Sequence, residues 1–220
     1  MSVDGFWIDI DVQVGATWTG RSLFIANPQK YGIKIQNTVN NDAGDWAISD
    51  SDFYAYSYAA DAAIRIESSG GGKITNCKVN CGWNGGTPTS RFGIGIDVNN
   101  SSSNAPTMIL HIQNTSIENF SVTGINFTIA TYFYKNIQIV GVGIGVPTDA
   151  SGDAITMLSD NVTHLLNVII SDCIFYGKTS GYAISLTKVN MVKGSDNIVE
   201  TGSFGSGLYT ASNCTNVTLS

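Results

Sequence analysis

Glu67 and Asp97 are the residues of this chain whose types and spacing best fit acid–base chemistry. Two carboxylates held side by side repel each other, so one tends to keep its proton near neutral pH and the pair supplies an acid and a base. Glycosidases use such pairs, at roughly 5 Å in retaining enzymes and wider in inverting ones. We therefore predict Glu67 and Asp97 as acid and base or nucleophile, with Arg65 tuning their charge. The alternative is that both carboxylates are solubilising surface residues that Arg65 screens.

The pair depends on two short strands with alternating apolar residues. If Ile64 points into a core, Arg65 and Glu67 point outward, because successive strand side chains alternate between faces. Aligning Ile64 with Ile94 then sets Glu67 beside Asp97 at roughly 4.8 Å on stacked strands. In this alignment Gly95 lies next to Arg65 and leaves open space.

The strand pattern returns along the chain at a nearly constant interval. Steps of 30, 31, 30 and 29 residues separate five isoleucines taken as equivalent: Ile64, Ile94, Ile125, Ile155 and Ile184. No long apolar segment between them could form the crossover helices that a doubly wound sheet needs. Each repeat is therefore predicted to be one coil of an all-β solenoid in which equivalent strands stack in parallel.

Two other parts of the chain differ from this regular repeat. Residues 1–20 are predicted to form an N-terminal strand that starts or caps the fold, and residues 21–220 the solenoid. An aromatic-rich insertion is predicted around residues 40–60, where Phe53 to Tyr58 form either a strand or a loop excursion.

Aromatic and amide side chains are candidates for binding a sugar by stacking and hydrogen bonds. The alternative for the aromatic rings is packing on the body of the protein or on a neighbouring subunit. The predicted substrate-binding residues are Tyr54, Tyr56, Tyr58, Trp83 and Asn126.

Small residues are predicted at the corners of the coils. Cys77 and Cys173 occupy matching places and are expected to be free, buried thiols. Asn76, Asn114 and Asn136 are expected to form an asparagine ladder along one corner. Neither the cysteines nor the two histidines have the spacing of a zinc site, and the aspartates at 42–52 lack the pattern of a calcium hand, so no metal or cofactor is predicted.

Composition excludes several classes of function. The 17 acidic and 11 basic residues leave a formal net charge of -6, which does not suit nucleic acid. Apolar runs are too short to cross a bilayer, and the first residues do not read as a secretory signal, so neither a membrane segment nor a signal peptide is expected.

The repeat resembles the right-handed, single-stranded parallel β-helix of the pectate-lyase-like superfamily, above all the central domain of bacteriophage tailspikes and tail fibres. The resemblance covers roughly residues 20–220 and lies in the apolar-X-apolar strands with Asn-Cys and Asn-Thr corners. It implies a homotrimer on a virion tail, in contact with other tail proteins. It also implies recognition of a host surface polysaccharide (capsule or O-antigen), often with cleavage by a hydrolase or lyase.

Two functions of different classes follow. The first is a tailspike or tail-fibre protein that binds a bacterial surface polysaccharide, with or without depolymerising it. The second is a non-catalytic receptor-binding or structural β-helix, such as an adhesin module. A secreted pectate-lyase-like enzyme is less favoured, because the sequence lacks an evident calcium-binding carboxylate cluster with a paired basic residue.

Overall fold

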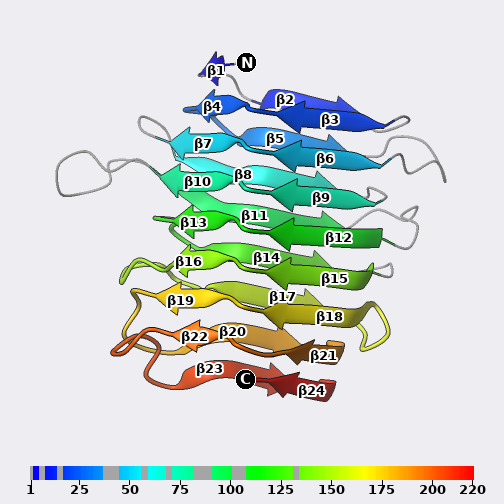
Figure 1. Ribbon diagram of the computed structural model, residues 1–220, viewed down its shortest axis with the longest axis vertical. Helices are drawn as coiled ribbons and strands as arrows, with labels where there is room; N and C mark the ends of the chain where they lie inside the picture. Colours follow the sequence, from blue (N-terminus) through cyan, green and yellow to red (C-terminus); the bar gives the residue numbers. More distant parts are fainter. Residues whose placement is uncertain are drawn as a thin grey trace.

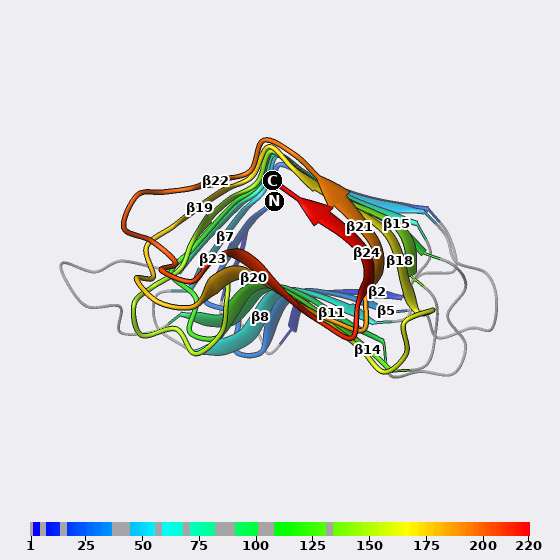
Figure 2. The same ribbon diagram turned by 90° about the horizontal axis from the view of Figure 1, so that it is seen from below.

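The protein is a parallel β-solenoid in the computed structural model (Figure 1), as the sequence predicts. The residues that the structure describes are 2–4, 8–13, 17–36, 45–55, 59–67, 71–81, 91–100, 108–130 and 134–220. They form three eight-stranded parallel sheets and no helix, and accordingly no helix that could cross a membrane. In Figure 2 the chain turns counterclockwise as it approaches the viewer, so the solenoid is right-handed.

Each coil contributes one strand to each sheet. Sheet A contains β1 (Ser2–Asp4), β4 (Phe24–Ala26), β7 (Asp52–Ala55), β10 (Lys78–Cys81), β13 (Ser116–Glu118), β16 (Gly143–Gly145), β19 (Ile174–Tyr176) and β22 (Ile198–Val199). Sheet B contains β2 (Ile8–Gln13), β5 (Tyr31–Gln36), β8 (Ala60–Glu67), β11 (Phe92–Asn100), β14 (Thr123–Ile129), β17 (Ile155–Ser159), β20 (Tyr182–Thr187) and β23 (Gly207–Ser212). Sheet C contains β3 (Trp18–Arg21), β6 (Trp46–Ser49), β9 (Gly72–Thr75), β12 (Met108–Gln113), β15 (Tyr134–Val140), β18 (Leu165–Ser171), β21 (Asn190–Gly194) and β24 (Thr215–Leu219).

Stacked isoleucines build the core inside the three sheets. One inward column of sheet B is fully buried on six successive strands and comprises Ile33, Ile64, Ile96, Ile125, Ile155 and Ile184. Each such side chain contributes about 1.5–3 kcal/mol by leaving water. Because β-branched residues also suit extended backbone, the same residues favour the strands and hold the coils together.

The corner between sheets C and A is a tight turn that requires a left-handed backbone. The residue after the sheet C strand has a positive φ in six successive coils, among them Asn76 (φ 54°), Asn114 (φ 49°) and Gly141 (φ 65°). Asparagine and glycine tolerate this conformation better than most residues. The amide of Asn76 also donates to Asp50 Oδ1 of the preceding coil at 3.2 Å. Asn76 and Asn114 therefore occupy equivalent places at one corner, as the predicted ladder requires.

Asn136 does not belong to that ladder. It lies within β15, opposite Asn167 of β18, at a place where the register of sheet C shifts by one residue. Both residues have positive φ, of 60° and 56°. The identity of the residue alone could not separate the two columns, because both use the same left-handed conformation.

The segment predicted as an insertion contains regular strands. Residues 46–49 and 52–55 form β6 and β7, which pair with the strands of the neighbouring coils, and Phe53 is fully buried. Residues 45–55 are thus part of the solenoid. Likewise β2, at residues 8–13, and β3, at residues 18–21, pair in parallel with β5 and β6 and belong to the first coil.

The alignment of Ile64 with Ile94 is wrong by two residues. Ile96, not Ile94, lies opposite both Ile64 and Ile125, whereas the alignment of the later isoleucines is confirmed. Gly95 is consequently buried at an inward corner and does not leave open space. A Cβ atom there would lie 2.5 Å from Ile117 Cγ2 and 2.6 Å from the carbonyl oxygen of Gly124.

Candidate functional site

The outer face of sheet B brings four of the predicted site residues together. Arg65 of β8 lies directly opposite Asp97 of β11, and Asp97 lies opposite Asn126 of β14. Glu67 lies two residues beyond Arg65 on the same strand, so its side chain emerges on the same face. Asp97 is therefore the neighbour of Arg65, and the predicted side-by-side pairing of Glu67 with Asp97 is wrong.

Arg65 lies between the two carboxylates. Its Nε donates to Glu67 Oε1 at 3.0 Å, and its Nη1 donates to Asp97 Oδ2. The other Glu67 oxygen, Oε2, forms an ion pair with Lys34 Nζ at 3.0 Å. The other Asp97 oxygen, Oδ1, accepts a hydrogen bond from Asn126 Nδ2 at 2.8 Å. Each of the four carboxylate oxygens thus has a cationic or amide donor.

This pairing keeps Glu67 ionised. Burial by itself disfavours the Glu67 carboxylate, but the hydrogen bond from Lys34 and the charges of Arg65 and Lys34 outweigh it and hold the pKa below its usual value. For Arg65, burial is likewise outweighed by the charges of Asp97 and Glu67, which raise the pKa of the guanidinium. Glu67 is therefore not the carboxyl that keeps a proton, as the predicted acid–base pair requires of one of its members.

A concavity of about 470 Å³ lies beside this cluster. Ala60, Ile94 and Val122 give it an apolar surface, and Val122 is 42% exposed. Asp61 and Arg65 are among the polar residues that line it. Most ligand-binding clefts combine a largely apolar wall with a few polar groups in this way.

Of the predicted aromatic platform, the structure describes only Tyr54, which does not line the concavity. Tyr54 lies on β7, in sheet A, where its ring contacts Phe24 with centroids 5.4 Å apart. Tyr56, Tyr58 and Trp83 lie outside the described residues.

Lys34 and Tyr31 are members of the cluster that sequence reasoning did not single out. Lys34 lies opposite Arg65 in β5, and the Tyr31 ring lies 5.8 Å from the Arg65 guanidinium carbon. The signal was present in the strand Gly-Ile-Lys-Ile at residues 32–35. Aligning Ile33 with Ile64 places Lys34 next to Arg65.

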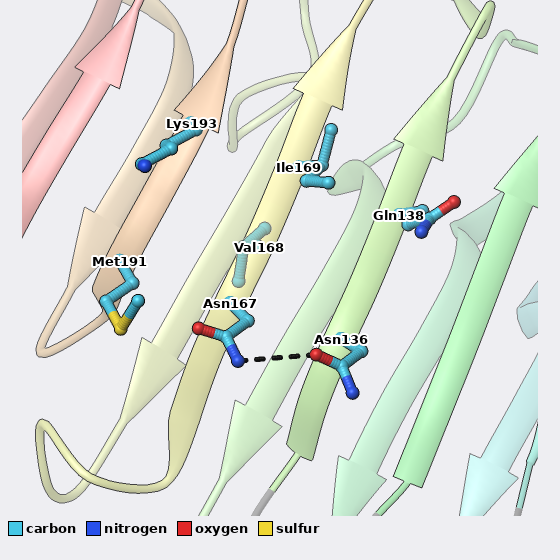
Figure 3. Close-up of a pocket in the computed structure, with 7 residues that line it drawn as sticks. All are labelled: Asn136, Gln138, Asn167, Val168, Ile169, Met191 and Lys193. Carbon is cyan, nitrogen blue, oxygen red and sulfur yellow. Dashed lines mark hydrogen bonds between the residues drawn. The ribbon is translucent and has the colours of Figure 1, made fainter.

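A second concavity, of about 260 Å³, lies on the outer face of sheet C (Figure 3). Asn136 of β15 and Asn167 of β18 lie side by side there, with Asn167 Nδ2 donating to Asn136 Oδ1 at 3.3 Å. Ile169, Met191 and Lys193 also line it. It shares no residue with the sheet B concavity.

The cysteines act as core residues. Cys77 and Cys173 occupy the same place after the tight turn, are free and are 3% and 0% exposed, as predicted. Burial is the main cause that raises the pKa of each thiol to about 11, which disfavours the reactive thiolate. In the described part of the chain, no three His, Cys, Asp or Glu side chains gather where they could hold a metal ion.

Comparison of the chain with models of protein families, with curated proteins and with solved structures returned no match.

Proposed function

We propose that this protein binds a bacterial surface polysaccharide through the concavity of sheet B, as the host-recognition part of a phage tailspike or tail fibre. The observation that carries the binding role is the concavity itself, where an apolar wall adjoins a set of fixed polar groups. Sugar rings present apolar faces and hydroxyl edges, which such a surface complements. The phage setting rests on the resemblance of the repeat to tailspike β-helices.

The contacts of the cluster favour binding over cleavage. A general acid must hold a proton at working pH, and a nucleophile needs a free carboxylate oxygen. Glu67 has a lowered pKa, and both Glu67 and Asp97 already accept bonds from Arg65. We therefore assign Arg65 and Asp97, which line the concavity, the role of a rigid polar edge for the ligand, and Glu67 the role of holding Arg65 in place. Residues locked by mutual contacts lose little entropy on binding.

Glycan-array binding and a reducing-end assay test this function. Val122→Gln replaces an exposed apolar side chain in the wall of the concavity. It is expected to weaken polysaccharide binding about three- to tenfold, because the ligand loses part of one apolar contact. Leu158→Gln is the matched control, since Leu158 is 45% exposed on the same sheet and does not line the concavity.

The outcomes separate the possibilities. Binding that is weakened by Val122→Gln and retained in Leu158→Gln supports the proposed surface. Equal effects of the two substitutions would place the ligand elsewhere, and absence of binding to any bacterial glycan would refute the function. Release of new reducing ends or unsaturated sugars that disappears in Asp97→Asn would refute the non-catalytic assignment.

A further inference from the structure

Charge is divided unequally among the three sheets. The strands of sheets A and B carry eight acidic residues, three in A and five in B, and three basic ones. The strands of sheet C carry no acidic residue within their described bounds. They contain four basic residues: Arg21, Lys73, Lys135 and Lys193. A chain with a net charge of -6 therefore has one face on which its strands contribute only positive charge.

Two of these lysines lie in one outward column of sheet C. Lys73 is followed on successive strands by His111, Gln138, Ile169 and Lys193. Four steps of about 4.8 Å separate the two lysines, a span of roughly 19 Å along the solenoid. Neither lysine forms an ion pair within the described part of the chain.

The sheet C concavity lies at the Lys193 end of this column (Figure 3). Ile169 and Met191 are 40% and 42% exposed, so exposed apolar side chains line the same concavity as Lys193. Gln138, Asn136 and Asn167 add amide groups that can donate and accept hydrogen bonds.

A repeated bulge creates this arrangement. Asn136, Asn167 and Met191 lie opposite one another on three strands, all with positive φ, of 60°, 56° and 57°. Such a bulge redirects a side chain out of the regular pleat. Met191 is the unusual member, since a left-handed conformation costs an ordinary residue about 1–2 kcal/mol.

We infer that the outer face of sheet C is a binding site for an acidic polysaccharide, with its centre at the concavity of Asn136, Asn167, Met191 and Lys193. A sugar carboxylate pairs with Lys193, hydroxyl groups bond the amides, and the apolar face of a ring packs on Met191. Lys73 pairs with a second carboxylate further along the same strand of sugar. This site is independent of the proposed function, because it lies on another sheet.

A polynucleotide fits this face less well. Its closely spaced phosphates require a dense row of cations, and single strands are held by stacking of bases on aromatic rings. No aromatic side chain is among the described residues that line the concavity, and its only basic side chain there is Lys193. Widely spaced carboxylates with many hydroxyl groups match the residues present.

The test is titration calorimetry of the full chain with mannuronate oligosaccharides and with the same oligosaccharides after reduction of their carboxyl groups. We expect the acidic form to bind at least about fivefold more tightly than the reduced form, because reduction of the carboxyl groups removes exposed ion pairs with lysine. Lys193→Gln is expected to weaken binding of the acidic form about three- to fivefold. Lys78→Gln, which removes the same charge from sheet A, is the control and is expected to change affinity less than twofold.

Asn167→Asp provides a second variant that preserves the fold, because aspartate also tolerates the left-handed conformation. It places a negative charge in the concavity and is expected to weaken binding of the acidic form more than about tenfold. Equal affinity for the acidic and reduced sugars, equal effects of Lys193→Gln and Lys78→Gln, or no binding of mannuronate by the folded chain would overturn the inference. Tighter binding of a single-stranded polynucleotide at the same salt concentration would also overturn it.

Discussion

Replacing Asp97 with Asn tests whether Arg65 organises the cluster on sheet B. The substitution keeps the size of the side chain and removes the charge that faces Arg65. Asp97 is 4% exposed, so solvent cannot replace the lost interaction. We expect the variant to fold and to be less stable.

The expected loss can be worked from the contacts. A hydrogen bond to a charged group contributes about 1.5–3 kcal/mol, and removal of one partner from a fully buried pair costs about 3–5 kcal/mol. Arg65 keeps its bond to Glu67 and its side chain is 16% exposed, which favours the lower end of these ranges. The predicted loss is about 2 kcal/mol, or a decrease of about 4–8 °C in the melting temperature of a chain this long.

A double-mutant cycle with Arg65→Met distinguishes this pairing from a general effect of the substitution. In the Arg65→Met background, Asp97 is a buried charge without its cation, so Asp97→Asn should cost nothing or stabilise the protein. Urea unfolding monitored by circular dichroism measures all four proteins. Asp61→Asn, at an exposed position, is the control and should change stability by less than about 0.5 kcal/mol. Equal costs of Asp97→Asn in the two backgrounds would refute the reasoning.

Three further predictions concern the buried position of Gly95, the stability of the protein at acid pH and the buried thiols. Gly95→Ala forces a Cβ against Ile117 and a backbone carbonyl and should lower the free energy of unfolding by about 1–3 kcal/mol, as thermal unfolding can measure. A Cβ at Gly143 meets no atom within 4 Å, so Gly143→Ala is the control and should be nearly neutral. Equal losses in the two variants would contradict the burial of Gly95 at the corner. Because the folded-state pKa of Glu67 is lowered, its stabilisation is present above about pH 4.3 and disappears as the pH falls through the folded value. Glu67→Gln should therefore be less stable than the parent at pH 7, with the difference in melting temperature closing in acid; a constant difference would count against the ion pairs. Cys77 and Cys173 should resist iodoacetamide in the folded protein at neutral pH and react after unfolding, as peptide mass spectrometry can show. Rapid labelling of the native thiols would disprove their burial.

The sequence predicted the solenoid because its apolar pattern has only one economical solution. Isoleucines at alternate positions require strands, and a step near 30 residues without helices requires the strands to stack as coils. The inward direction of Ile64 and the outward direction of Arg65 followed from the same alternation. The burial of Cys77 and Cys173 also followed, since their local sequences place them at equivalent corners.

Register was harder to predict than side-chain direction. A slip by one residue turns every apolar side chain outward, but a slip by two leaves the pattern intact. Ile94 and Ile96 were therefore equally good partners for Ile64 by sequence. The two alignments give Arg65 a different neighbour, Gly95 or Asp97, and so a different chemistry.

By itself, the sequence determined the class of fold, the composition of the core and the polar types on each strand, because these depend on local alternation and on the repeat length. Only the tertiary structure decided which strands face each other and with what register, since loops of unequal length change the step from coil to coil. With the observed register, Arg65 lies between Glu67 and Asp97 on sheet B, where the sequence predicted two adjacent carboxylates. The fold also gathers lysines from distant parts of an acidic chain onto sheet C.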